Sequence, residues 1–236
     1  MIRIYYAERD TTLYERHSEQ NTGIDQILEL TKVASGSRAF ENGADLGIQA
    51  NTYNTRVLLD FGSEITALSQ SIVNNEIPAL SNVHIASASV FLSLHATDAT
   101  DLLQTYDIKV YPISESWDNG RGKFDDNPKT KIGSSWKFRS GDAVAQTATP
   151  WNTGSAHSRN TSAGTSEPLG GGTWITGSGF EASQSFQNES PDLRIDVTDI
   201  IKKWTAGGIT NNGFIIKRPY ADEIDGKIRG SIKFFG

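Results

Sequence analysis

The chain has 236 residues and no cysteine, which excludes disulfides, thiolate metal sites and cysteine nucleophiles. Its net charge of −6 is uneven, −9 over residues 1–118 (7 basic, 16 acidic) and +3 over residues 119–236 (15 basic, 12 acidic), and neither half has the basic excess of a nucleic-acid-binding protein. The apolar runs fall far short of the roughly 18 residues of a transmembrane helix, and the N-terminus lacks the pattern of a secretory signal, so we expect no membrane partner.

Alternating apolar side chains predict a chain made mostly of strands. Serine (24), threonine (21) and glycine (22) favour strands and turns over long helices. The clearest strand, residues 56–61, would bury Val57, Leu59 and Phe61 and turn Arg56 and Asp60 to the opposite face. A second strand, residues 85–94, would bury Ala86, Ala88, Val90, Leu92 and Leu94. Further strands are predicted over residues 106–110, 192–197, 213–217 and 231–235.

One short helix is well signalled, over residues 196–204. Asp196 or Thr198 would cap its start, and Gly207 and Gly208 follow its end. Its apolar side includes Trp204, which we expect to pack in the interior. Residues 65–77 have weaker helical spacing and predict a turn or a short helix in a connection.

Between residues 117 and 190 the chain becomes rich in Gly, Ser, Asn and Thr, and we call this segment the excursion. It carries Trp117, Trp136, Trp151 and Trp174. Tryptophans in such a long irregular segment could anchor a protein interface, stack on a glycan, or form a small second core. We place no domain boundary here, because the strands on its two sides need each other to cover their apolar faces. The sequence therefore predicts one all-β domain over residues 1–236, an antiparallel β-sandwich with one short helix and a long loop-rich insertion.

Catalytic and cofactor sites find little support in the sequence. The four histidines lack the H-x-H or H-E-x-x-H spacing of a metal site. Asp118, Asp125 and Asp126 lie close together and could hold calcium through carboxylate oxygens, but they lack the EF-hand spacing, and a solvated turn is the alternative. We expect no enzyme activity and no cofactor, with calcium as the single candidate ion.

The order of several short motifs resembles the DNRLRE-type β-sandwich domain. These motifs are 21–23, 27–30, 55–61, 86–92, 116–118, 196–198 with Trp204, and 212–216. Longer strings are similar to virion structural proteins of marine tailed bacteriophages, namely 111–124, 171–174 and 230–235. The resemblance implies a jelly-roll fold related to carbohydrate-binding modules. Proteins of this type usually continue past Phe235 into a final strand. Either the natural chain extends beyond Gly236, which we favour, or the last strand is missing and the edge of its partner strand is open to a neighbouring subunit.

Two classes of function follow from this resemblance. The first is a non-enzymatic structural component of a tailed-phage virion, in the tail, neck or head decoration, present in several copies and in contact with other virion proteins. The second is a carbohydrate-binding or host-adhesion module, for which a glycan is the ligand. Exposed tryptophans over a groove would favour the second class, and buried or subunit-contacting tryptophans the first.

Overall fold

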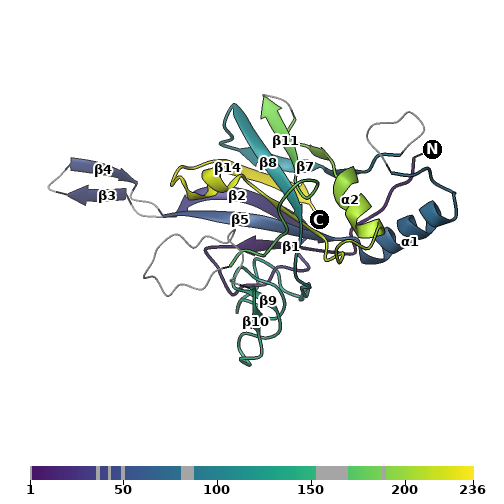
Figure 1. The fold of residues 1–236 in the computed structure, drawn as a ribbon. Helices are drawn as coiled ribbons and strands as arrows, with labels where there is room; N and C mark the ends of the chain where they lie inside the picture. The colour runs from purple at the N-terminus through teal and green to yellow at the C-terminus, as the bar shows by residue number, and fades with distance from the viewer. Residues whose placement is uncertain are drawn as a thin grey trace.

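An antiparallel sheet of eight strands forms the centre of the fold in the computed structural model (Figure 1), which describes residues 2–35, 38–41, 44–48, 51–80, 88–152, 170–187 and 190–236. The strands of this sheet are β1 (Arg9–Tyr14), β2 (Ile27–Ser35), β5 (Asn51–Asp60), β7 (Ala96–Thr100), β8 (Thr105–Pro112), β11 (Ala182–Gln187), β13 (Phe214–Lys217) and β14 (Gly230–Phe235). Their order is β11-β8-β13-β5-β2-β14-β7, with β1 also paired to β5. Strands from both halves of the chain are interleaved across the sheet.

The sheet forks at the middle of β5. Residues 51–54 of β5 pair with β2, whereas residues 55–60 pair with β1. Where β2 leaves β5, threonine hydroxyls replace the backbone partners: the Thr31 N–H donates to Thr55 Oγ1 (2.7 Å), and the Thr55 hydroxyl donates to the Glu29 carbonyl (2.5 Å). The Glu29 N–H donates to Thr12 Oγ1 at 3.0 Å. Because buried backbone groups need partners, these hydroxyls pair with the Thr31 and Glu29 backbone groups where the sheet splits.

One face of the sheet packs on the main hydrophobic core, which we call the first core. It contains Leu28, Leu30, Val57, Leu59, Leu68, Leu80, Leu92, Ile108, Val110, Phe186, Leu193, Ile195, Val197, Ile200, Ile201, Trp204, Phe214, Ile216, Ile232 and Phe234. A two-stranded sheet of β6 (Phe91–Leu94) and β12 (Leu193–Asp196) covers this core together with the helices that carry Leu68 and Trp204. The alternation that predicted buried Val57 and Leu59 is confirmed, and the fold is an antiparallel all-β sandwich.

The predicted strand over residues 85–94 is shorter within the described residues. Residues 85–87 lie outside them, and Ala88 forms only an isolated bridge with Leu80 before β6 begins at Phe91. Leu92 is buried as expected. Two further pairs of strands lie apart from the main sheet: β3 (Arg38–Glu41) with β4 (Ala44–Ile48), and β9 (Phe138–Ser140) with β10 (Thr149–Pro150).

The part of the chain that the structure describes has three helices rather than the one predicted. The expected helix is α2 (Thr198–Thr205), in which the Asp196 carboxylate accepts the Thr198 N–H at 2.9 Å. Trp204 is buried against Phe214, with ring centroids 4.6 Å apart, as predicted. The short α3 (Tyr220–Ile224) precedes β14.

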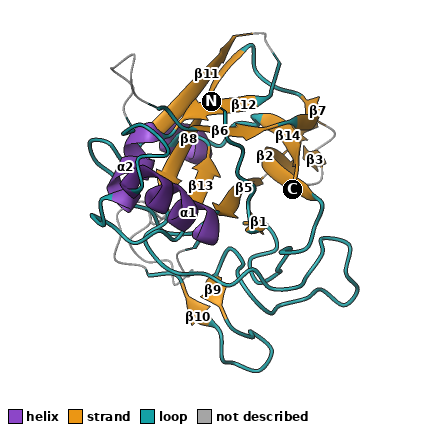
Figure 2. Cartoon of the chain, turned by 90° about the vertical axis from the view of Figure 1, so that its right-hand side faces the viewer, coloured by secondary structure: helices purple, strands orange, loops and turns teal. Residues whose placement is uncertain are grey.

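The longest helix is α1 (Gly62–Val73), where the sequence predicted only a turn or a short helix. Figure 2 shows it beside α2, next to β13 and β5. Its first amides are capped from outside the helix, because Glu8 Oε1 accepts the N–H groups of Ser63 (2.6 Å) and Glu64 (3.2 Å). The Ser63 hydroxyl also donates to Glu8 Oε1. This hydrogen bond makes the largest contribution to lowering the pKa of Glu8, and the two N–H groups lower it further. A cap 55 residues away in sequence leaves no local signal, which explains why the helix was underestimated.

Candidate functional site

The four tryptophans of the excursion lie inside the protein, on the second face of the sheet. They form a second hydrophobic core, which we call the tryptophan core: Leu13, Leu58, Ile113, Trp117, Trp136, Trp151, Trp174 and Ile215. The four indoles are only 2–6% exposed. The indole N–H of Trp117 donates to the Asn212 carbonyl, and that of Trp151 donates to the Ser135 carbonyl, both at 2.9 Å.

This burial corrects the expectation that the four indoles form a contact surface for a partner or a glycan. Their rings are covered by residues of the chain itself, so the second-core alternative describes them. Arg56 and Asp60, which point to the same side of β5, are also buried, at 1% and 4% exposure. A strand that alternates apolar and charged residues usually has one solvated face, but here the excursion covers it.

Arg56 is the polar centre of the tryptophan core. Its guanidinium lies 4.7 Å from the ring of Trp136 and 5.0 Å from that of Trp174. It makes a bidentate ion pair with Glu223 of α3, with N–O distances of 3.0 and 2.8 Å, and donates to the Gly171 carbonyl at 2.7 Å. The planar guanidinium satisfies a carboxylate, a carbonyl and two aromatic faces at once, which explains how a charge is accommodated there.

Lys217 completes the ion cluster. Its Nζ lies 2.8 Å from Glu223 Oε2 and donates to the Arg218 carbonyl at 2.7 Å. Burial lowers the pKa of Lys217 to about 8, although Glu223 opposes the shift. Burial alone would raise the pKa of Glu223, but the charges of Arg56 and Lys217 outweigh it and hold that pKa below its usual range. The cluster is paired within the chain, so we assign it to the fold rather than to catalysis.

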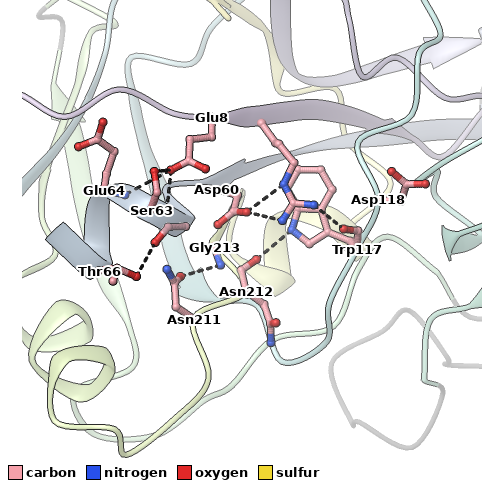
Figure 3. A network of polar contacts seen from close by, with 12 residues as sticks. Glu8, Asp60, Ser63, Glu64, Thr66, Trp117, Asp118, Asn211, Asn212 and Gly213 are labelled. Carbon is pink, nitrogen blue, oxygen red and sulfur yellow. Dashed lines mark hydrogen bonds and ion pairs between the residues drawn. The ribbon is translucent and has the colours of Figure 1, made fainter. Parts of the chain in front are cut away.

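A second polar network fixes the start of the excursion to β1 and β5 (Figure 3). Arg9 pairs with Asp60, lies 5.0 Å from the ring of Trp117, and donates to the Trp117 carbonyl at 3.0 Å. Trp117 is tied in turn to Asn212, in the turn that leads into β13. These contacts join four segments that are distant in sequence at one edge of the tryptophan core.

Asn21 holds the next part of the excursion in place. Its amide nitrogen donates to the carbonyls of Asn119 (2.7 Å) and Ser134 (2.8 Å), and its amide oxygen accepts the N–H of Gly122 (2.8 Å). Gly120 is in the left-handed region (φ 76°), and a Cβ there would lie 2.3 Å from Asn21 Oδ1. The buried Asn21 therefore explains why glycines recur in the part of the excursion that surrounds it.

The calcium candidates Asp118, Asp125 and Asp126 do not converge. Asp126 Oδ2 accepts the Lys123 N–H (2.8 Å) and the Thr130 hydroxyl (2.6 Å), so that carboxylate stabilises its own loop. Asp118 Oδ1 accepts the Gly120 N–H at 3.4 Å. Among the described residues, no group of three or more His, Asp or Glu side chains is placed to hold a metal.

A groove that the sequence did not reveal lies where the excursion meets the sheet. Its volume is about 340 Å³, and it is lined by Tyr14, Glu15, Arg16, His17, Glu29, Thr31, Val33, Tyr53, Asn54, Thr55, Asp98, Thr100, Phe124, Ser231 and Lys233. The floor is the face of β7, β14, β2 and β5 that points away from the first core. The alternating sequence pattern predicts only that these strand residues are polar. Which of them lie side by side depends on how β14 aligns with β2 and β7, which the pattern does not give.

The wall of the groove is aromatic. Phe124 of the excursion packs against Tyr14, with ring centroids 4.9 Å apart, and against His17 at 5.8 Å. Burial, and then the nearby Glu29 carboxylate, raise the pKa of Tyr14 far above its usual value, so its hydroxyl stays protonated. The excursion thus builds one side of the groove as well as covering the tryptophan core.

Comparison of the chain with protein-family models, with curated proteins and with solved structures finds no match. No helix in the described ranges is long and apolar enough to cross a membrane. The fold and the two buried networks define an all-β sandwich whose second face is closed by its own excursion, and the sites available to other molecules are those on its surface.

Proposed function

We propose that the protein is a non-enzymatic structural component of a tailed-phage virion, acting through contacts with other virion proteins. One structural observation carries the contact role. The described part of the excursion is a folded layer anchored to the sheet, yet it leaves the apolar side chains of Ile132 and Val144 50% and 76% exposed. Apolar groups held on an anchored layer suit a protein interface, because little further ordering is needed on binding. The longer strings that are similar to phage virion proteins, residues 111–124, 171–174 and 230–235, support the virion as the location.

The placement of these side chains supports contact through the outer surface of the excursion rather than through its indoles. Figure 1 shows β9 and β10 standing away from the main sheet, beyond β1. Val144 lies in the turn that follows β9, where the Asp142 carboxylate accepts its N–H at 2.8 Å. A fixed turn with an apolar tip provides a defined surface for a neighbouring subunit.

The first test asks whether the chain is part of the particle. Mass spectrometry of purified virions from a phage that encodes this chain should detect it in stoichiometric amounts, and imaging of the particle should show which proteins it touches. Absence from purified particles would overturn the proposal.

The second test asks which surface makes the contact. A double variant, Ile132→Asp with Val144→Asp, should keep the melting temperature of the purified protein and fail to enter particles. Val73→Asp is the matched control, because Val73 on α1 is 70% exposed and lies outside the excursion. Loss of incorporation in the control but not in the double variant would assign the contact to a different surface.

A further inference from the structure

The floor of the groove presents polar side chains in two rows across the strands. Antiparallel register places Lys233 of β14 between Asp98 of β7 and Glu29 of β2. The same register places Ser231 between Thr100 and Thr31. Neighbouring members of a row are about 4.8 Å apart, the spacing between strands, and the rows are separated by two residues along each strand. The result is a regular array of hydroxyl, carboxylate and ammonium groups on the groove floor. Asp98 and Thr100 are exposed at its edge, and Ser231 and Thr31 lie deeper, at 9% and 8% exposure.

Three charged groups in the groove have partners within the chain. Glu29 pairs with Lys233 at 3.3 Å, and Glu15 accepts both the backbone N–H and the side-chain amide of Asn54 at 2.8 Å. A ligand with a strong charge would have to compete with these internal partners. Hydroxyls such as those of Thr100 and Ser231 serve as both donors and acceptors, which suits an uncharged ligand rich in hydroxyl groups.

Aromatic and apolar surface borders the polar rows on two sides. Phe124 is half-buried in the excursion wall, and Tyr53 is half-buried on β5. Tyr53 is paired in register with Val33, which is 41% exposed. Flat rings beside hydroxyl groups match the two kinds of surface on a sugar, its C–H faces and its hydroxyl edge.

From this arrangement we propose that the groove binds a neutral oligosaccharide, with its hydroxyl groups on the Asp98–Lys233–Glu29 and Thr100–Ser231–Thr31 rows and its C–H faces against Tyr53 and Phe124. The site is distinct from the four tryptophans, which are buried, and from Ile132 and Val144. It is independent of the virion role, because purified protein alone should bind the ligand.

The test begins with the purified full chain on a microarray of neutral glucan and mannan oligosaccharides, with alginate and sulfated oligosaccharides on the same array. The strongest neutral ligand is then titrated by calorimetry at 50 mM and 500 mM NaCl. We expect binding to a neutral class, with a Kd that changes less than twofold between the two salt concentrations, because no net charge is neutralised. Failure of every neutral oligosaccharide to bind at millimolar concentration would overturn the proposal.

Two variants locate the binding site. Tyr53→Ala removes a ring face and should weaken binding at least tenfold, and Asp98→Ala on the exposed strand β7 should weaken it about fivefold without affecting the fold. Tyr220→Ala is the control, because Tyr220 is a partly exposed tyrosine on α3 outside the groove, and its Kd should stay within twofold of the wild-type value. Binding that both groove variants leave unchanged would refute the assignment, as would a preference for alginate or for a sulfated oligosaccharide that disappears at 500 mM NaCl. None of these results bears on whether the chain is found in virions.

Discussion

The two cores of this protein pack on opposite faces of the same strand, β5, and are built from different kinds of side chain. Leu59 faces the first core and its neighbour Leu58 faces the tryptophan core, so the two sides of β5 can be compared directly. The first core is filled by aliphatic and aromatic side chains from strands and helices. The tryptophan core is assembled around ions, with Arg56 and Lys217 held between indoles and Glu223. The comparison shows that a sheet face whose charged residues predict exposure to solvent can be buried. Burial requires that the covering layer supply both aromatic rings and countercharges.

The strongest test of this difference is Arg56→Ala. The substitution leaves the buried Glu223 with Lys217 alone, and leaves the Gly171 carbonyl without its donor. Breaking a buried ion pair from one side should lower the free energy of unfolding by about 3–5 kcal/mol in urea denaturation. Arg56→Lys should recover little of this, because an ammonium lacks the guanidinium fork. Arg16→Ala, at an exposed arginine, is the control, and a loss below about 1 kcal/mol for Arg56→Ala would show that the ion cluster is dispensable.

The paired variants Leu58→Ala and Leu59→Ala compare the two cores at equal chemistry. Each leucine is at most 2% exposed, so each variant should cost about 2–5 kcal/mol in the free energy of unfolding. A solvated second face would instead make Leu58→Ala cost less than about 0.5 kcal/mol. Equal losses therefore establish that the excursion closes the second face, and a large loss for Leu59 alone would mean that it does not.

Asn21→Asp should loosen the excursion while sparing the first core. The new carboxylate oxygen would face the Asn119 and Ser134 carbonyls, where the amide now donates two hydrogen bonds. We expect a loss of about 2–3 kcal/mol. Hydrogen exchange should accelerate over residues 117–134 more than in β8 or β13. Asn75→Asp is the control, because Asn75 is exposed and its positive φ suits both residue types. Uniform acceleration of exchange across the protein would contradict a local role for Asn21.

Asp10 contrasts with the paired ions of the tryptophan core, because burial and a second carboxylate, Asp25, both disfavour its charged form. Asp10 lies on β1 opposite Leu59, and burial, with a smaller contribution from Asp25, raises its pKa to about 6 from 3.8. The folded protein therefore holds this proton more tightly than the unfolded chain, and Asp10 reduces stability as pH rises from about 4 to about 6. Asp10→Asn should then stabilise the protein by about 1 kcal/mol at pH 7.5, allowing for its partial exposure, and give no gain below pH 4. Thermal melts across this pH range measure the effect, with Asp107→Asn as the control; a gain that does not depend on pH would refute it.

The first core was predictable because it depends on local pattern. Alternation placed Val57 and Leu59, and helical spacing placed Ile200, Ile201 and Trp204, all of which are buried as expected. A second core was among the alternatives for the four tryptophans, but the sequence did not place Arg56 in it, because burial of Arg56 depends on Glu223, which follows 167 residues later. The same applies to α1, whose cap is Glu8, and to the groove, which exists only once β14 has aligned β7 with β2. Features made by residues that meet only in three dimensions carry no short-range signal.

The interleaved order of the sheet also sets when this protein can fold. Strand β2 is made early in synthesis, but its partner β14 follows about 200 residues later, where Phe234 aligns with Leu28. Strand β5 likewise pairs with β13, which is synthesised much later. Pairings this distant in sequence fold slowly, and until β13 and β14 leave the ribosome the edges of β2 and β5 are open to association with other nascent chains. Yield in a recombinant host should therefore depend on translation speed and chaperone supply more strongly than the stability of the finished protein would suggest.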